Sequence, residues 1–407
     1  VRGVTSTLCL LVLATLTVTA QETFPVNGVV DKALVRTVFD HAMVHTQSGE
    51  VLEDASVVVF KGRIEAVGPT ATLQVTGPAV REDLTGFHVY PSFVELSSRW
   101  GMPSAQEERY SRGSQDLSDK KGAYGWNEAI RPETRAAAVL DPSMAGAEKK
   151  REAYLKAGFG TVLSHVQDGI VRGTGALAVL SEDPRRALLI PDASAHFSFR
   201  KGSSSQDYPR SLMGATALLK QTHFDATWYA DASRLNERLE TNLSLEAFNG
   251  QRDLPVFFHA GGWQDILRAS AVADVVELKT PYIMFAGNDT YQRLEEVQAT
   301  GSDLVLSLNF PTPFDVSDPY LSRLIGLDEL KHWELAPSNA ARVHMAGIRF
   351  AFTTDGLNDV GSTWSAVRKC IQHGLPADAA LAALTEVPAA MVGAENRVGR
   401  IQPGLEA

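Results

Sequence analysis

The sequence predicts an α/β fold in which a barrel of alternating strands and helices follows a small antiparallel β-unit. From position 88 to 397, short apolar strands alternate with long amphipathic helical stretches, a pattern typical of βα units around a parallel sheet. Positions 33–80 instead hold short β-rich runs separated by turns. The alternation alone leaves a doubly wound open sheet possible. No Gly-x-Gly-x-x-Gly motif follows a strand, however, and its absence weakens that alternative.

The N-terminal β-unit is predicted from its turns. A strand at 56–60 precedes a tight turn at 61–63 and a returning strand at 64–68, and the polar run at 46–50 joins two further β-rich runs. Such a unit buries little core by itself and should pack against something larger.

The barrel is predicted from seven candidate strands and the helical runs between them. The strands are expected at 88–96, 160–165, 187–190, 255–259, 282–285, 304–308 and 348–354. Helices are expected at 147–157, 212–219, 263–276 and 291–299. The irregular stretch 97–142 directly follows the first barrel strand, a position that lies over the catalytic face of a barrel. We interpret it as a lid or substrate loop, with a long insertion of no catalytic role as the alternative.

The overall charge argues against one class of partner, and the N-terminal segment predicts export. The formal net charge of −10 and the pI near 5.5 argue against nucleic acid as a partner. The N-terminus resembles a secretory signal: Arg2, an apolar run at 8–16, and Val18-Thr19-Ala20 before a cleavage point at Gln21. We therefore expect a periplasmic or extracellular protein with no membrane contact after cleavage. Only Cys370 would remain, in a packing role.

Segments at both ends carry a resemblance to a known family. Positions 57–68 and 83–95 resemble the opening of amidohydrolase-superfamily proteins of the imidazolonepropionase and dihydroorotase type, and 398–407 resembles their return to the β-sandwich. The resemblance implies a (β/α)8 TIM barrel with a small N-terminal antiparallel β-sandwich. The expected organisation is a signal peptide at 1–20, the β-sandwich at 21–86, the barrel at 87–397 and the start of the return at 398–407. The remaining return strands, and a possible second domain, are expected beyond Ala407.

The resemblance also implies a metal site, and several of its ligands are missing. The family places His-x-His after the first barrel strand, where this chain has Ser97-Ser98-Arg99. The histidine of the fifth strand matches His259, that of the sixth is absent from 285–288, and the aspartate of the eighth matches Asp355. No Lys or Glu matches the bridging position. The implied cofactor is a divalent metal, zinc before others, held by His259 and Asp355 with Asp355 as catalytic base. Hydrogen-bonded structural roles for both residues stay open.

Other residues are candidates for the missing ligands or for substrate binding. His165 and His196 lie near strand ends and offer replacement ligands, with Asp168 close to His165 in sequence. Arg99 places a positive charge where a metal ligand is expected, to hold an anion or to pair with Glu95 or Asp355. Two predicted loop segments, 173–175 and 201–206, combine glycine with hydroxyl or amide side chains that could donate to a substrate. The substrate-binding candidates are Arg99, His165, Arg172, Arg200 and Ser203.

These observations favour an exported hydrolase that acts on C–N bonds of non-peptide or small peptide-like molecules by metal-activated water. The alternative is an inactive barrel that binds a ligand or supports a second, competent domain. A metal-free lyase or isomerase that uses Arg99 and Asp355 is a third possibility. The expected partners are a small-molecule substrate and either that second domain or further copies of the chain.

Overall fold

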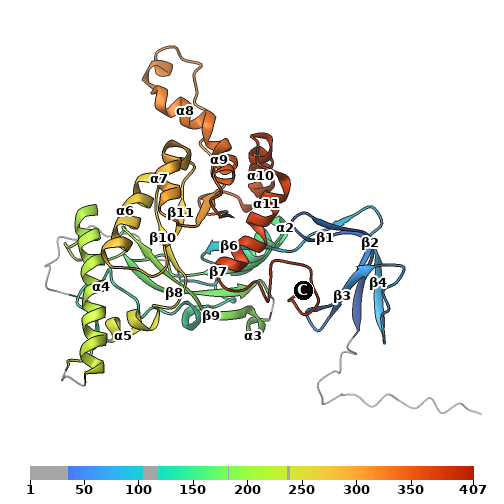
Figure 1. Ribbon diagram of the computed structural model, residues 1–407, viewed down its shortest axis with the longest axis horizontal. Coiled ribbons are helices and arrows are strands. Elements are labelled where there is room, and N and C mark those ends of the chain that lie inside the picture. Colours follow the sequence, from blue (N-terminus) through green and yellow to red (C-terminus); the bar gives the residue numbers. More distant parts are fainter. Residues whose placement is uncertain (1–34, 104–117, 119, 182, 236–238) are drawn as a thin grey trace, which may run out of the picture.

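The computed structural model describes residues 35–103, 118, 120–181, 183–235 and 239–407 of the chain (Figure 1). The predicted signal peptide lies outside the described residues. No helix within the described ranges is long and apolar enough to cross a membrane.

The N-terminal unit is a five-stranded sheet that stands beside the barrel (Figure 1). Its strands are β1 (Arg36–Gln47), β2 (Glu50–Phe60), β3 (Arg63–Pro69), β4 (Ala79–Asp83) and β5 (His88–Val89). The predicted hairpin is confirmed: β2 pairs antiparallel with β3 across Lys61 and Gly62, whose φ angles of 53° and 76° suit a two-residue turn. Strands β4 and β5 pair parallel with β1, so the sheet is mixed.

The C-terminal segment packs on this N-terminal sheet. The backbone N–H of Ile401 donates to the Thr46 carbonyl at 2.8 Å, and that of Ile64 donates to the Leu405 carbonyl at 2.9 Å. Ile401 and Leu405 are buried in a small apolar core with Ile64 and the β1 and β2 side chains. The two ends of the described chain therefore stabilise one sheet together.

Eight strands form the barrel sheet in the order β13-β12-β11-β10-β9-β8-β7-β6. They are β6 (Phe93–Ser98), β7 (Phe159–Ser164), β8 (Val171–Val179), β9 (Leu188–Ser198), β10 (Val256–His259), β11 (Ile283–Ala286), β12 (Leu304–Ser307) and β13 (Phe350–Thr353). Six of the seven predicted strands are confirmed, although β9 extends well beyond its predicted end at 190. The strand predicted at 88–96 is correct only from Phe93 onward, because His88–Val89 form β5 and pair with β1 in the N-terminal sheet. The prediction of a binding loop at 173–175 is wrong. Those residues lie inside β8, which runs antiparallel to both neighbours.

Helices cover the outside of the barrel (Figure 1). They are α1 (Ala136–Val139), α2 (Ala147–Ala157), α3 (Pro184–Ala187), α4 (Leu212–Arg234), α5 (Leu243–Gly250), α6 (Trp263–Val275), α7 (Leu294–Ala299), α8 (Leu327–Leu335), α9 (Asn339–Met345), α10 (Thr363–Gln372), α11 (Ala377–Leu384) and α12 (Glu386–Met391). The four predicted helices are confirmed, and the one predicted at 291–299 begins as a 3-10 turn, Thr290–Arg293. Cys370 is buried on α10, as expected for a packing role.

Apolar side chains fill the inside of the barrel. Leu163, Phe257, Phe285 and Val305 are buried there, on four different strands. A second, larger core lies between the sheet and the helices. Since alternate side chains along each strand point to opposite faces, one face supplies the barrel interior and the other the helix contacts. With its interior filled, the barrel offers open space for chemistry only at its ends.

The described part of the stretch 97–142 does not cover the mouth of the barrel. Ile130 and Arg135 form isolated bridges to Val171 and Thr174 of β8, so this part runs along the sheet. Within the described part of the stretch, only Arg99 lines the cavity at the barrel mouth. Residues 104–117 and 119, in the middle of the predicted lid, lie outside the described residues.

Candidate active site

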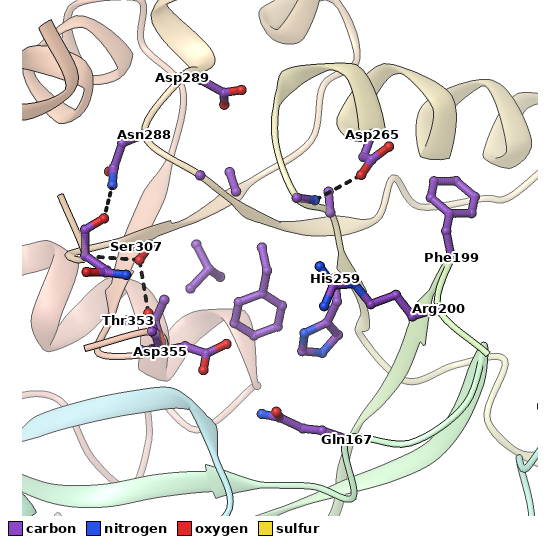
Figure 2. Close-up of a pocket in the computed structure, with 18 of the residues that line it drawn as sticks. Gln167, Phe199, Arg200, His259, Asp265, Asn288, Asp289, Ser307, Thr353 and Asp355 are labelled. Carbon is purple, nitrogen blue, oxygen red and sulfur yellow. Dashed lines mark hydrogen bonds between the residues drawn. The ribbon is translucent and has the colours of Figure 1, made fainter. Parts of the chain in front are cut away.

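A cavity of about 940 Å³ opens at the end of the barrel where the parallel strands finish. Figure 2 shows His259 and Asp355 projecting into it, with Gln167 on one side and Asn288 and Asp289 on another. His259 ends β10, and Asp355 follows β13. The cavity therefore lies at the carboxyl ends of the strands, where barrel enzymes place their catalytic groups.

Three histidines converge beneath this cavity. His165 directly follows β7, His196 lies within β9 and His259 ends β10. Each contributes one ring nitrogen to a group whose atoms all lie within 4.8 Å of one another. The His165 and His196 rings stack with centroids 3.8 Å apart and an interplanar angle of 3°, and His196 Nδ1 lies 3.2 Å from His259 Nε2. We call these three residues the histidine cluster.

Burial keeps the histidine cluster neutral. It lowers the pKa of each of the three imidazoles well below the usual value. The positive charge of Arg172 lowers all three pKa values further, and Arg99 adds to the effect on His165 and His259. Neutral imidazoles keep a lone pair on one ring nitrogen, which is the form that binds a metal ion.

The donor set of the histidine cluster fits a divalent metal ion. Both ring nitrogens of His165 are buried and have no hydrogen-bond partner among the described residues, which is costly unless something else satisfies them. Three neutral histidines are one of the common ligand sets of catalytic zinc sites. Because the lone pairs lie in the ring planes, one of the two stacked rings must turn before His165 and His196 can share an ion.

A neighbouring serine and glycine set the position of His196. The Ser194 hydroxyl lies 2.8 Å from His196 Nε2, which leaves Nδ1 directed toward His259. This is the arrangement in which a hydrogen bond to one ring nitrogen orients the other for a metal. A Cβ on Gly175 of β8 would lie 2.6 Å from His196 Nε2. The imidazole therefore fits only because position 175 carries no side chain.

Asp355 faces the cavity outside the histidine cluster. Its side chain is exposed, and its backbone N–H donates to Thr353 Oγ1 at 3.1 Å. Ser307 Oγ donates to the Asp355 carbonyl at 3.0 Å, which ties the residue to β12 as well. Among the described residues, Asp355 forms no ion pair with Arg99. The carboxylate is free to accept a proton from a group in the cavity.

Glu95 has a structural role, not the pairing with Arg99 that was one sequence-based alternative. Its buried carboxylate accepts hydrogen bonds from Ser97 N at 2.8 Å, Thr353 Oγ1 at 2.5 Å, Thr354 N at 2.7 Å and Thr354 Oγ1 at 2.6 Å. Burial raises its pKa, and these four donors oppose that rise. No backbone ladder joins the described strands β6 and β13, so these bonds connect the first and last barrel strands.

The three predicted arginines line the cavity together. Arg99 follows β6, Arg200 follows β9, and Arg172 lies at the start of β8. Because β8 is antiparallel, its first residues lie at the rim where its neighbours end. Arg99 is exposed and its Nε donates to Gln167 Oε1 at 2.7 Å. The three share one wall, on the side of β6 to β9.

Ser203 and Asp168 also line the cavity, but they are bonded to each other. The Ser203 backbone N–H donates to Asp168 Oδ1, and its hydroxyl to Oδ2, both at 2.6 Å. Arg131 forms an ion pair with the same carboxylate. Asp168 is not part of the histidine cluster. These contacts use the side chains to hold the loop after β9 in place.

The members of the histidine cluster are each recognisable in the sequence as candidate ligands, but their association is not. The sequence predicts His165 and His196 equally as replacement ligands and pairs His259 with Asp355 as metal ligands. The structure instead groups His259 with His165 and His196. The alternation of Ser194, His196 and Ser198 along β9 was a signal that these side chains share one face. The role of Glu95 left no comparable signal in the sequence.

Comparison with known proteins gives a family match over part of the sequence and a shared fold over most of the chain. The model of the amidohydrolase family matches residues 337–407, a segment that includes β13 and Asp355, and confirms the predicted resemblance there. No curated protein matches the chain.

Solved structures share the fold over most of the chain. An amidohydrolase from Thermotoga maritima MSB8 is 20% identical with a TM-score of 0.67, over 91% of this chain and 92% of that one. A Xaa-Pro dipeptidase with methionine bound in its active site is 15% identical with a TM-score of 0.50, over 91% and 92%. Molinate hydrolase is 12% identical with a TM-score of 0.50, over 92% and 88%. These likenesses confirm the predicted (β/α)8 barrel fold.

Proposed function

We propose that this chain, an amidohydrolase-type barrel, is a metal-dependent hydrolase that acts on a C–N bond of a small molecule. The observation that carries the proposal is the histidine cluster, three neutral imidazoles under a cavity whose rim also holds Asp355. The match to the amidohydrolase family and the hydrolases among the structural neighbours support the reaction class. Export remains a prediction from the N-terminal sequence.

His165, His196 and His259 would hold the ion, and zinc fits three imidazole ligands best. A bound divalent ion supplies Lewis acidity, which lowers the pKa of water and polarises a carbonyl group. His259 faces the cavity, whereas His165 and His196 are nearly inaccessible from it. A substrate therefore approaches the histidine cluster from the His259 side.

Asp355 would act as the general base. Its carboxylate faces the cavity, and bonds to Ser307 and Thr353 hold its backbone. It would take a proton from the attacking water and return one to the leaving nitrogen, the exchange that hydrolysis of an amide requires. Asn288, whose amide donates to the Asn309 carbonyl at 2.8 Å, and Gln167 complete the polar lining near these two groups.

Metal content and amide hydrolysis, measured together, test the proposal. The mature chain, dialysed and analysed by elemental mass spectrometry, should hold about one divalent ion per chain. His165→Asn and His259→Asn should lose the ion, and His344→Asn, an exposed histidine on α9, should keep it. Hydrolysis of a panel of small amides should follow the metal content. A folded wild type that holds no metal would contradict the proposal.

A second candidate function is that of a barrel that binds a ligand without turning it over. The observation that favours it is Arg99, which stands where the family has metal-binding histidines and which cannot bind a metal. A metal-free chain that binds small amides without hydrolysing them would establish this candidate.

A further inference from the structure

Arg172 is a buried cation without an acidic partner in the described part of the chain. Only 7% of the residue is exposed, and no carboxylate among the described residues lies within ion-pair distance of it. Its Nε donates to the Gly169 carbonyl at 3.1 Å, and its two terminal nitrogens have no hydrogen-bond partner among the described residues. Burial lowers its pKa to about 10; the charge of Asp168 opposes this fall, and the charges of Arg200 and Arg99 add to it. A cation buried in this way is costly unless an anion accompanies it.

The nearest acidic groups do not supply that anion. Asp168 and, more weakly, Asp355 attract Arg172, but both carboxylates lie beyond ion-pair distance of it, and Asp168 is bonded to Arg131 and Ser203. Elsewhere in the cavity lining, Asp265 pairs with Arg268, and Asp289 accepts from the Trp263 backbone N–H. The β6 to β9 wall of the cavity therefore carries a local excess of positive charge in a chain whose net charge is −10.

Two further guanidinium groups face the same space. Arg200 is exposed and extends toward the middle of the cavity, in the direction of His259 (Figure 2). Arg99 uses only its Nε on Gln167, so its terminal nitrogens remain available. A guanidinium group presents paired N–H donors that match the two oxygens of a carboxylate or phosphate. Arg99, Arg172 and Arg200 together are the arginine wall.

We propose that the arginine wall, centred on the buried Arg172, binds an oxyanion of the substrate while the bond to be cleaved lies at His259 and Asp355. The inference rests on the proposed function, and it narrows the substrate to a small amide that carries a carboxylate or phosphate group. The buried guanidinium fixes the anionic end because its position in β8 leaves it little freedom. Arg99 and Arg200, which are exposed, add attraction and close around the bound group.

Binding to the metal-stripped chain tests the arginine wall separately from hydrolysis. The probes are N-acetylglycine, its neutral counterpart N-acetylglycinamide, and inorganic phosphate, each titrated by calorimetry. Wild type should bind N-acetylglycine or phosphate at least about tenfold more tightly than the neutral amide, and the tighter of the two identifies the oxyanion. No preference for either anion over the amide would overturn the inference. Anion binding by a chain that neither holds metal nor hydrolyses amides would refute the proposed function and leave the arginine wall standing.

Variants locate the binding within the arginine wall. Arg172→Met should weaken anion binding about tenfold or more. Arg172→Lys keeps the charge but loses the paired donors, so its anion affinity should lie between those of wild type and Arg172→Met. Arg200→Gln, at an exposed position that should not affect folding, should weaken it about threefold. Arg252→Gln is the matched control, because that guanidinium also has no acid partner among the described residues but lies outside the cavity. Unchanged anion binding in folded Arg172→Met and Arg200→Gln would contradict the inference.

Discussion

Glu95 and Thr354 join the two ends of the barrel sheet. The carboxylate of Glu95 accepts from the Thr354 backbone N–H at 2.7 Å and from its hydroxyl at 2.6 Å. The same carboxylate accepts from Thr353, whose hydroxyl in turn accepts from the Asp355 backbone N–H. One buried side chain thus closes the barrel and supports the loop that carries the proposed base.

Glu95→Gln should lower the free energy of unfolding by about 2 kcal/mol, the cost of one buried donor left without a partner. One carboxylate oxygen accepts from the Ser97 backbone N–H and the other from that of Thr354. The amide of the glutamine has only one oxygen. In either orientation its NH2 group would therefore face one of these two backbone N–H donors, which would lose its acceptor.

Chemical denaturation measures this effect. Glu148→Gln, at an exposed position on α2, is the control and should leave the unfolding curve nearly unchanged. Equal midpoints for the two variants would show that the Glu95 carboxylate does not hold the barrel closed.

Gly175→Ala should weaken zinc binding by about 10- to 100-fold, the range seen when groups that orient a metal ligand are altered. The new Cβ would lie 2.5 Å from Ser194 Oγ and 2.6 Å from His196 Nε2, so the imidazole must move. Zinc affinity is measured by competition with a chelator. Gly250→Ala, where a Cβ meets nothing within 4 Å, is the control. An unchanged zinc affinity in Gly175→Ala would show that His196 is not a metal ligand.

Asp355→Asn should lower kcat by about 10²- to 10⁴-fold while the metal content stays near that of wild type. The reason is that Asp355 lies outside the histidine cluster, which alone offers three ligands. Elemental analysis and amide hydrolysis are compared in the same preparations. Asp359→Asn, an exposed position on the same loop, should retain activity. Loss of the ion from Asp355→Asn would instead make this residue a metal ligand.

His223 should make the protein less stable as the pH falls. Its ring packs against Phe197 and Phe248, and burial lowers its pKa to about 4. In the unfolded chain a histidine titrates near pH 6.5, so between about pH 6.5 and 4 the unfolded state binds more protons. The contribution of the neutral ring is complete above this window and is lost on acidification, by up to about 3 kcal/mol.

His223→Gln removes this titration. As the pH falls from 6.5 to about 4, the free energy of unfolding of wild type should therefore decrease relative to that of His223→Gln. Denaturation curves at several pH values measure it, with His344→Asn on the exposed face of α9 as the control. A difference that stays constant over this window would show that the His223 ring is not held neutral.

Much of the fold could be predicted because it depends on local patterns. Buried strands appear in the sequence as short apolar runs, and helices as longer runs in which apolar residues recur every three to four positions. Both patterns can be read directly from this sequence. The helix at Ala147–Ala157 was predicted to the residue, and the Lys61-Gly62 turn followed from its chemistry. Strand β8 was missed because Gly173 and Gly175 resemble a loop. Thr134 and His196 pack closely against these two glycines, a reason that local sequence does not reveal.

The sequence by itself determined the strand and helix pattern and placed His165, His259 and Asp355 at strand ends, where barrel chemistry occurs. Only the tertiary structure decided which of these residues meet. His165 and His196 stack although β8 lies between their strands, and Arg172 reaches the cavity because β8 runs in the opposite direction. The alternation of side chains along a strand, which is a local property of the sequence, fixes which face of the strand a residue occupies. Strand order, direction and register, which depend on contacts between distant segments, fix its neighbours.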